Sequence, residues 1–576
     1  MIPTFTPASD YVPPGLDATK WEQLRPLYAA LIDRPIGSPG DLERLILDRS
    51  ELDAAAAQAG SELYIAMTCH TDDAGANAAY LAFVEGVQPG LKESGFELDR
   101  KIAQSAHAAG LDPSRYGVLL RDIRAAVELF RPENVPIETA LSKLDQEYSQ
   151  VCGAMTAQFR GQEMTLAQLG RYQEETDRAT RRQAWALVAA RRLADRGRID
   201  EVYDRMLELR QRAAANAGFD NYRDYAFKAR RRFDYTVADC DAFAAGVERH
   251  VVPAMRRLNA RRAEALGLGR LRPWDLAVDI KGRPPLRPFA DAQDMVLRAA
   301  RVFERMDPEL GALFGSLRAG GSLDLASRKG KAPGGYQATR DRSRLPFIFM
   351  NAVGVQRDVE TILHEAGHAF HALLCRPEPI LAYRSDAPIE FCEVASMTME
   401  LVAAPFLDEF YAPAEAHRAR RVHLEQIAVM LPWIATIDQF QHWVYTNPGH
   451  TRAERDAAWA GVYERFAPLV DWSGQEEGVA LAQARDAMWQ RQLHLFGMPF
   501  YYIEYGIAQL GALQLDGVYR ADPARAMRGY KAALRLGGSR PLPELFAAAG
   551  IEFGFSPERI ERTWRGVEEL LDTIPA

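Results

Sequence analysis

The 576-residue sequence is poor in cysteine and histidine, with five of the former and 11 of the latter. The cysteines form no CxxC pair and are too sparse for the disulfide framework of a small secreted protein. No uncharged apolar run approaches the roughly 18 residues that a membrane span requires. The first residues, MIPTFTPASDYVPPG, lack the basic and apolar regions of a secretion signal. We therefore expect a cytoplasmic protein in a reducing compartment, without a membrane anchor.

An excess of positive charge is also absent, because 70 Lys and Arg residues face 78 Asp and Glu residues, for a net charge of -8. This balance excludes a global positive field that would attract nucleic acid or an anionic membrane. Two arginine-dense stretches, 179–198 and 256–272, carry Ala, Leu and Val at helical spacing between the arginines. We interpret them as amphipathic helices with solvated charged faces, and expect neither nucleic acid nor a membrane as partner.

The predominant pattern in the sequence is the helical periodicity of its apolar residues. Apolar residues recur at three- and four-residue intervals from about residue 17 to 265 and again over 359–571. Prolines, glycines and β-prone residues interrupt this pattern over 266–357, where we place the only sheet, with strands at 334–339 (GGYQAT) and 346–351 (PFIFMN). The sequence therefore predicts a mainly α fold with one small β-sheet just upstream of the second helical region.

The stretch HEAGH, residues 364 to 368, matches the pattern H-E-x-x-H. Histidines four residues apart share one helix face with Cβ atoms roughly 6 Å apart, so His364 and His368 can reach a single Zn²⁺. Glu365 can take a proton from a water molecule and return it to a leaving amine. Gly367 costs a helix about 1 kcal/mol relative to Ala, which indicates that another backbone approaches this side of the helix.

A third protein ligand leaves one tetrahedral position for water, as in catalytic zinc sites. The metzincin pattern is excluded, because its required Gly and His fall on His371 and Leu374. The acidic candidates around the next predicted helix are Asp386, Glu390, Glu393 and Glu400. Spacing alone favours Glu393 or Glu390 as the ligand, and Glu400 as a carboxylate that orients an imidazole.

Two segments together resemble a known family. HEAGHAFH (364–371), followed by EVASMTME (393–400), is similar to the HExGHxxH and E-x-x-S-x-x-x-E patterns of the M3 zinc metallopeptidases, the thimet oligopeptidase and oligoendopeptidase F group. The resemblance continues in family order and covers about residues 110 to 570. Its further segments are TLAQLGRYQEETDRATRRQAW (165–185), RAAANAGFDNYRDY (212–225), RPWDL (272–276) and PFYYIEYGIAQ (499–509).

The resemblance implies one zinc ion per chain. In the family pattern the first glutamate of the second segment is the third ligand, so His364, His368 and Glu393 would bind Zn²⁺. Glu365 would act as general base and then as general acid. His371 is expected to pack near the site without binding the metal.

The resemblance also implies a large helical body split by a deep substrate channel with zinc at its floor. We expect residues 1–190 to form a helical N-terminal region that lines one wall, and residues 191–576 to form the catalytic region. Within the latter, the HExxH helix is expected at 359–374, the third-ligand helix at 388–404 and a His/Tyr segment at 494–506. Since folded proteins would not reach such a site, the implied substrates are short unstructured peptides, cut internally.

The segment HLFGMPFYYIEYG, residues 494–506, gathers one histidine and three tyrosines. By itself, an aromatic-rich helix more often belongs to a core. A peptidase must, however, stabilise an oxyanion, and Tyr O–H and His N–H groups can donate hydrogen bonds to it. The resemblance implies this role for His494, Tyr501 and Tyr505, and a substrate contact for Tyr502.

Upstream of the metal helix, we expect the segment 346–351 to form an edge strand to which an extended peptide can add its backbone. GGYQ (334–337) is expected to form a mobile loop beside it. The substrate-binding residues predicted in these two segments are Gly335, Tyr336 and Phe347.

Two rival functions stay open. A zinc carboxypeptidase or dipeptidase would use the same helix and clamp the substrate's terminal carboxylate with an arginine. A non-catalytic peptide-binding scaffold would have no need of Glu365. Cys392 adjoins Glu393 in the chain, but helical neighbours point about 100° apart, so we expect an inert thiol. The sequence carries no signal for an oligomeric state.

Overall fold

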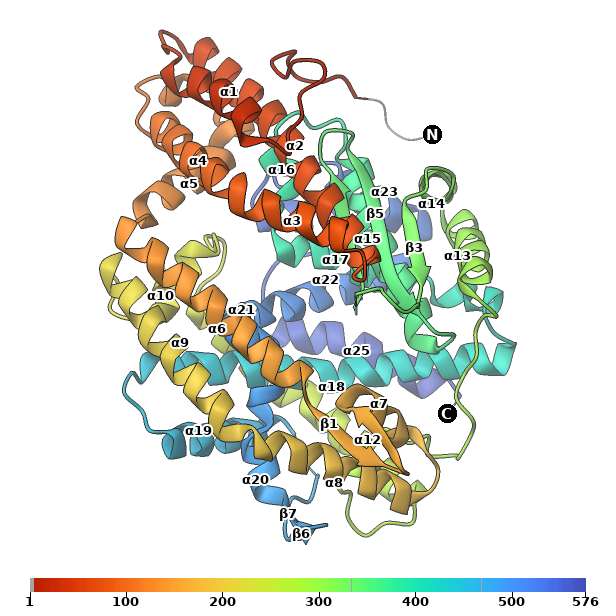
Figure 1. Cartoon of the computed structure of the whole chain (residues 1–576). Helices are drawn as coiled ribbons and strands as arrows, with labels where there is room; N and C mark the ends of the chain where they lie inside the picture. The colour runs from red at the N-terminus through yellow and green to blue at the C-terminus, as the bar shows by residue number, and fades with distance from the viewer. Residues whose placement is uncertain (1–4, 333, 468, 576) are drawn as a thin grey trace.

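Helices make up most of the computed structural model, which describes residues 5–332, 334–467 and 469–575 (Figure 1). The predicted mainly α class, with few and short strands, is confirmed. The helices before the three-stranded sheet are α1 (Trp21–Asp33), α2 (Pro39–Cys69), α3 (Ala74–Gly86), α4 (Gln88–Ala103), α5 (Pro113–Leu129), α6 (Val135–Gly153), α7 (Leu166–Gly170), α8 (Arg178–Ala194), α9 (Arg196–Asn216), α10 (Tyr222–Ala229), α11 (Val237–Gly246), α12 (Val252–Ala265), α13 (Ala292–Met306) and α14 (Pro308–Ala319). Those after it are α15 (Gln356–Leu374), α16 (Leu381–Ser385), α17 (Ile389–Val402), α18 (Pro413–Thr446), α19 (Arg452–Phe466), α20 (Leu481–Asp486), α21 (Leu493–Gly497), α22 (Tyr502–Ala521), α23 (Pro523–Leu534), α24 (Leu542–Ala548) and α25 (Pro557–Thr573).

The two strands predicted before the metal helix exist as β4 (Tyr336–Arg340) and β5 (Leu345–Ala352), which pair antiparallel. A third strand, β3 (Leu323–Ala326), pairs parallel with the other side of β5, giving the order β3-β5-β4. The prediction that 346–351 forms an edge strand is therefore wrong. β5 is the central strand because β3 pairs with its second side. With four residues, β3 is too short to be recognised in the sequence.

The expectation of a single sheet is also wrong, because two small hairpins lie elsewhere. One joins β1 (Thr156–Phe159) to β2 (Gln162–Thr165), and the other joins β6 (Gln475–Glu476) to β7 (Val479–Ala480). Each two-residue turn has positive φ at both positions, Arg160–Gly161 and Glu477–Gly478. Turns of this geometry usually contain Asn-Gly or Asp-Gly. Because Arg or Glu occupies the first position here, neither hairpin was predicted from the sequence.

Two large hydrophobic clusters account for most of the core. The smaller of them collects residues 18–123 together with Ile380 and Tyr383, and the larger one runs from Leu144 to Ile574 and contains α15, α17 and α22. The first cluster is tied to the segment after α15 by Tyr383, whose hydroxyl donates to the carbonyl of Arg115 at 2.7 Å. The domain boundary at residue 190 stays a prediction, as does the N-terminal channel wall.

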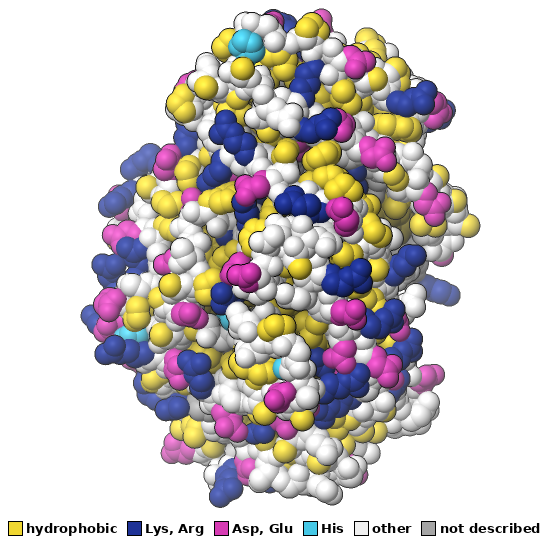
Figure 2. All heavy atoms as spheres, turned by 90° about the vertical axis from the view of Figure 1, so that its left-hand side faces the viewer, with side chains coloured by type: hydrophobic (Ala, Val, Ile, Leu, Met, Phe, Trp, Pro, Cys, Tyr) yellow, Lys and Arg dark blue, Asp and Glu magenta, His cyan; other side chains and the backbone are white. Residues whose placement is uncertain are grey.

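Helix α17 lies between α15 and α22 in the centre of the larger cluster. A Cβ at Gly511 of α22 would lie 2.8 Å from Val394 of α17, so this glycine permits the two helices to pack closely. On the face shown in Figure 2, Lys and Arg side chains are interspersed with Asp and Glu. Within the part of the chain that the structure describes, no helix has the length and apolar character needed to cross a membrane.

Candidate metal centre

The helix that carries HEAGH starts at a well-defined point. Gly354 turns the chain with a φ of +87°, and α15 begins two residues later. Asp358 Oδ2 accepts the backbone N–H groups of Val353, Gly354 and Val355 at 2.9, 2.9 and 3.0 Å. These N–H groups belong to the segment just before the helix, so the carboxylate stabilises the turn that joins β5 to α15.

The predicted ligands converge. His364 Nε2 lies 3.2 Å from His368 Nε2 and 3.4 Å from Glu393 Oε2, and His368 Nε2 lies 3.8 Å from the same oxygen. Zinc bonds of about 2.0–2.1 Å in a tetrahedron place ligand atoms about 3.3 Å apart. The three atoms therefore fit one zinc ion with little rearrangement. The side chains of His364 and His368 are 23% and 19% exposed, so water and substrate can reach this position.

Gly367 brings the third ligand within reach. A Cβ at this position would lie 2.5 Å from Ser396 Cα and 2.6 Å from the carbonyl oxygen of Ala395. The backbone of α17 thus touches α15 one residue before His368, which confirms the prediction that a glycine here admits another backbone.

We expect Gly367→Ala to destabilise the protein by about 1–3 kcal/mol, because the clash is with backbone that cannot rotate away, and to weaken zinc binding. Chemical denaturation and zinc titration measure the two effects. Gly461, exposed on α19 with open space around it, is the matched control; there, alanine should stabilise by up to about 1 kcal/mol. Equal behaviour of the two variants would contradict this account of Gly367.

Glu400 orients the first histidine. His364 Nδ1 lies 2.6 Å from Glu400 Oε1; because a carboxylate only accepts, the proton sits on Nδ1 and the Nε2 lone pair faces the metal position. The other oxygen, Oε2, accepts from His423 Nε2 of α18 at 3.1 Å. Burial opposes ionisation of Glu400, but the hydrogen bonds from the two histidines outweigh it and hold the pKa of the carboxyl well below its usual range.

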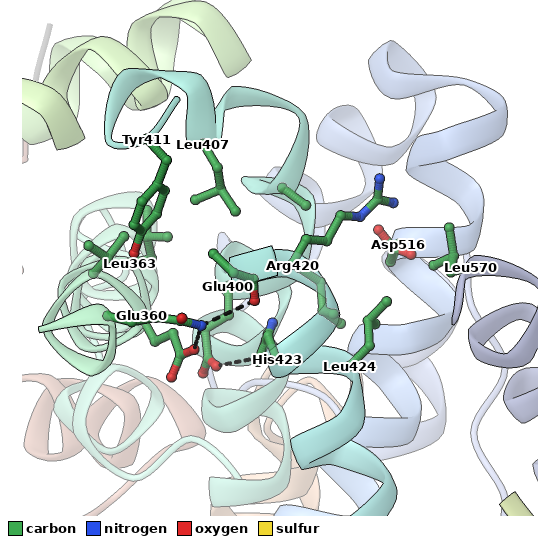
Figure 3. Close-up of a pocket in the computed structure, with 15 residues that line it drawn as sticks. Glu360, Leu363, Glu400, Leu407, Tyr411, Arg420, His423, Leu424, Asp516 and Leu570 are labelled. Atoms are coloured by element: carbon green, nitrogen blue, oxygen red, sulfur yellow. Dashed lines mark hydrogen bonds and ion pairs between the residues drawn. The ribbon is translucent and has the colours of Figure 1, made fainter. Parts of the chain in front are cut away.

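His423 is a residue that sequence reasoning missed. It lies on a different helix from the motif, and nothing in its spacing pointed to a partner. Figure 3 shows its ring directed at Glu400 inside a pocket that Tyr411 and Arg420 also line. His364, His368 and Glu393 do not line this pocket, which therefore lies behind the candidate ligands.

We expect Glu400→Gln and His423→Ala each to lower zinc affinity by about 10- to 100-fold, the usual effect of removing a group that orients a ligand. Competition with a chelator of known affinity measures the change. Tyr411→Phe, in the same pocket but without contact to a ligand, should leave the affinity unchanged. An affinity that stays at the wild-type value in both test variants would refute the orienting role.

Glu365 is buried, and burial raises the pKa of its carboxyl to about 7. The negative charges of Glu393 and Glu400 add to this shift. A carboxyl group whose pKa lies near neutral pH can both accept and return a proton under physiological conditions. The group is therefore suited to the role predicted for it.

His494 lies on α21 with a defined tautomer. Gln492 Oε1 accepts the indole N–H of Trp433 at 3.2 Å, so the amide nitrogen is the end that faces His494 Nδ1, at 2.7 Å. Since an amide N–H only donates, Nδ1 accepts and the ring proton sits on Nε2. Burial and the nearby charge of Arg230 lower the pKa of His494 to about 4. The imidazole is thus neutral at pH 7 and has an N–H to donate.

Three tyrosine rings surround His494, with centroids 5.5 Å (Tyr501), 5.0 Å (Tyr502) and 6.0 Å (Tyr505) from its own. Burial and the charge of Glu393 raise the pKa of the Tyr501 and Tyr505 hydroxyls, which are therefore protonated donors on the metal side. Burial also raises the pKa of Tyr502, but Glu393 does not contribute, and its hydroxyl faces Trp433. The charge of Glu393 thus acts on the Tyr501 and Tyr505 hydroxyls and not on that of Tyr502.

The turn before Tyr501 is held by side chains that sequence reasoning did not single out. Arg230 donates to the carbonyl of Pro499 at 2.7 Å, and Arg232 donates to the carbonyl of Phe500. Phe500 has a φ of +64°, and its N–H donates to Gln441 of α18 at 2.6 Å. A left-handed non-glycine residue persists only where its surroundings hold it, so these contacts set the position of the tyrosines.

Of the substrate-binding residues predicted upstream, only Gly335 lies beside α15, with its Cβ position 3.6 Å from Thr361. The Tyr336 hydroxyl forms a 2.6 Å hydrogen bond with Thr68 of α2, and Phe347 packs in the same cluster against α2. Alternation along β5 places Phe347 on the face opposite to α15. The predicted substrate contacts through the Tyr336 and Phe347 side chains are therefore not supported by the geometry.

Two neighbours of the ligands behave as expected. His371 is buried against Phe391, and burial lowers its pKa to about 4, so it is a neutral core residue. The Cys392 thiol donates to the carbonyl of Ala387 at 3.6 Å, and burial raises its pKa. Neither side chain joins the candidate ligand group formed by the described residues.

Known proteins match this chain in sequence and in fold. The model of peptidase family M3 matches residues 171–563. Oligopeptidase PepF of Bacillus subtilis (strain 168) is 22% identical over 334 residues, 57% of this chain and 48% of PepF, so the match spans about half the length of that relative. The structure of PZ peptidase A with an inhibitor has a TM-score of 0.87 at 28% identity, covering 96% of this chain and 97% of the other. An X-ray structure of an oligoendopeptidase F has a TM-score of 0.88 at 29% identity, covering 98% and 99%.

Proposed function

Because the chain belongs to peptidase family M3, we propose that it is a zinc-dependent endo-oligopeptidase that hydrolyses internal bonds of short unstructured peptides. The observation that carries the proposal is the convergence of His364, His368 and Glu393 at 3.2 to 3.8 Å, with Glu365 on the same helix. Five free cysteines support a reducing, cytoplasmic location.

His364 and His368 supply neutral imidazole nitrogens and Glu393 a carboxylate oxygen, a donor set typical of catalytic zinc. Bound zinc supplies Lewis-acid chemistry and makes water nucleophilic near neutral pH. Glu365 accepts the proton of the attacking water and passes it to the nitrogen of the leaving amine, so the peptide C–N bond breaks with no net proton consumed in the site.

The oxyanion that develops on the scissile carbonyl needs donors that are already in place. His494 donates its Nε2–H, and the hydroxyls of Tyr501 and Tyr505 donate beside it. Support comes from the tautomer that Gln492 imposes on His494 and from the charge of Glu393 acting on both tyrosines. Loss of one such donor typically costs about 10²–10³ in kcat.

Substrate backbone would add to the free edge of β4, which is one of the two edge strands of the sheet and the one that continues from Gly335 beside α15. Gly335, at the start of this edge and beside α15, lets a peptide approach without a side chain in the way. In this proposal a deep channel restricts access to short chains, and no side-chain pocket selects the substrate by size.

The endopeptidase mode is tested with internally quenched peptides blocked at both ends, in a length series, beside the same sequences with free ends. We expect cleavage of the blocked short peptides and none of the same sequence held inside a folded domain. A carboxypeptidase or dipeptidase would trim only the free-ended series, and that result would overturn the endopeptidase mode while leaving the metal site in place.

A further inference from the structure

A second cluster of metal-ligating side chains lies outside the site described above. Cys240 of α11 meets Asp438 and His442 of α18, and their ligand atoms all lie within 4.8 Å of one another. The three residues are 1%, 1% and 7% exposed, respectively. Asp438 and His442 share a helix face through i, i+4 spacing, while Cys240 comes from a distant part of the chain.

The nitrogen and oxygen atoms of this cluster lack hydrogen-bond partners. Among the residues that the structure describes, none forms a hydrogen bond with either carboxylate oxygen of Asp438 or with either ring nitrogen of His442. His442 Nε2 lies 3.2 Å from Asp438 Oδ2, close to the separation of about 3.3 Å between two ligands of tetrahedral zinc. Buried polar groups are normally satisfied, so these atoms point to a bound species that the protein does not itself supply.

The surroundings favour a cation as that species. Asp438 places a buried carboxylate beside the Cys240 thiol and the His442 ring. Nη2 of Arg232 donates to Glu504, at 2.9 Å, and to the carbonyl of Phe500, while its Nε and Nη1 have no hydrogen-bond partner among the described residues. The rings of Phe227 and Phe500 flank His442, with centroids at 6.0 and 5.4 Å. A carboxylate buried beside apolar rings, as Asp438 is, is normally paired with an opposite charge or coordinates a metal ion.

We propose that Cys240, Asp438 and His442 bind a second divalent transition metal, separate from the candidate catalytic ion. Thiolate, carboxylate and imidazole together are a zinc donor set, and three protein ligands leave the fourth position for a water molecule. As the metal–sulfur bond forms, the thiol proton leaves to solvent.

The metal would hold the backbone behind the catalytic tyrosines. It joins α11 to α18 beside Gln441, the residue that accepts the N–H of Phe500 just before Tyr501. Its role is therefore structural, and it does not depend on the proposed peptidase function.

Cobalt substitution separates the two sites. The full chain is stripped of metal, reloaded with Co²⁺ and measured for metal content and near-ultraviolet absorption. We expect two ions per chain and a sulfur-to-cobalt charge-transfer band, which the His364, His368 and Glu393 site cannot produce because it contains no sulfur. Cys240→Ser should remove the band and one ion. Cys152→Ser, a half-buried cysteine outside the cluster, should remove neither.

The reciprocal variant keeps the two proposals distinguishable. A His364→Ala, His368→Ala double variant should lose one ion and keep the band, whatever the outcome for the peptidase. No band in the wild type, or a band that survives Cys240→Ser, overturns the second site. One ion per wild-type chain with the band present supports the second site and counts against the candidate catalytic ion instead. Since the absence of the band is measured on the wild-type protein, the proposal is testable even if Cys240→Ser fails to fold.

Discussion

Glu365→Gln is expected to lower kcat by about 10²–10⁴-fold or more, the contribution of a positioned general base, while zinc remains bound. Glutamine keeps the volume of the buried side chain but cannot accept a proton from water. The neighbouring candidate ligands His364 and His368 are unchanged, so we expect the metal position to be retained. Steady-state hydrolysis of a quenched peptide, together with the zinc content of the same sample, measures both parts of the prediction.

Glu360→Gln is the matched control, because it removes a carboxylate from the same helix away from the ligand atoms. It should keep kcat close to that of the wild type. Wild-type activity in Glu365→Gln would remove the general base from the mechanism. If the wild-type protein and Glu365→Gln both bound peptide without cleaving it, the non-catalytic scaffold would be favoured instead.

His368→Ala is expected to remove the candidate catalytic zinc and reduce hydrolysis to background. Two of the three ligand atoms, on His364 and Glu393, would remain, and two protein ligands rarely retain a catalytic zinc ion. Added zinc should raise the Tm of the wild-type protein, because a ligand that binds only the folded state stabilises it, and should raise that of the variant less.

The control for this variant lies one turn further along α15. His371→Leu changes a buried, neutral histidine that packs on Phe391, and it should keep both zinc and activity. Loss of the metal in His371→Leu, or its retention in His368→Ala, would reassign the ligands. The pair of variants thus separates the two histidines that the HExGHxxH pattern places side by side.

Local signals accounted for much of the fold and the site. Helices α15 and α17 lie within a few residues of the predicted ranges 359–374 and 388–404, because their apolar periodicity and flanking Gly and Pro act over single turns. Gly367 was readable because a glycine in a helix interior is costly without a packing reason. The role of Glu400 in orienting an imidazole was predictable from its spacing to Glu393.

Contacts between distant segments were not readable in this way. His423 donates to Glu400 from another helix, and Arg230 and Arg232 bind the carbonyls before Tyr501 across more than 250 residues of chain. Such partners depend on how helices pack, and each residue alone resembles an ordinary surface or core position. The cluster of Cys240 with Asp438 and His442 of α18 could not be predicted for the same reason, because it depends on how two helices pack.

The sequence by itself determined the helical class and a metal motif whose residues lie one helical turn apart, because periodicity on one helix defines which side chains share a face. The tertiary structure alone decided that β5 is central, that the Tyr336 and Phe347 side chains face α2, and which groups orient His364 and His494. These features depend on strand order and helix packing. Both result from burial of side chains that are distant in the sequence, so the spacing of residues within one segment does not reveal them.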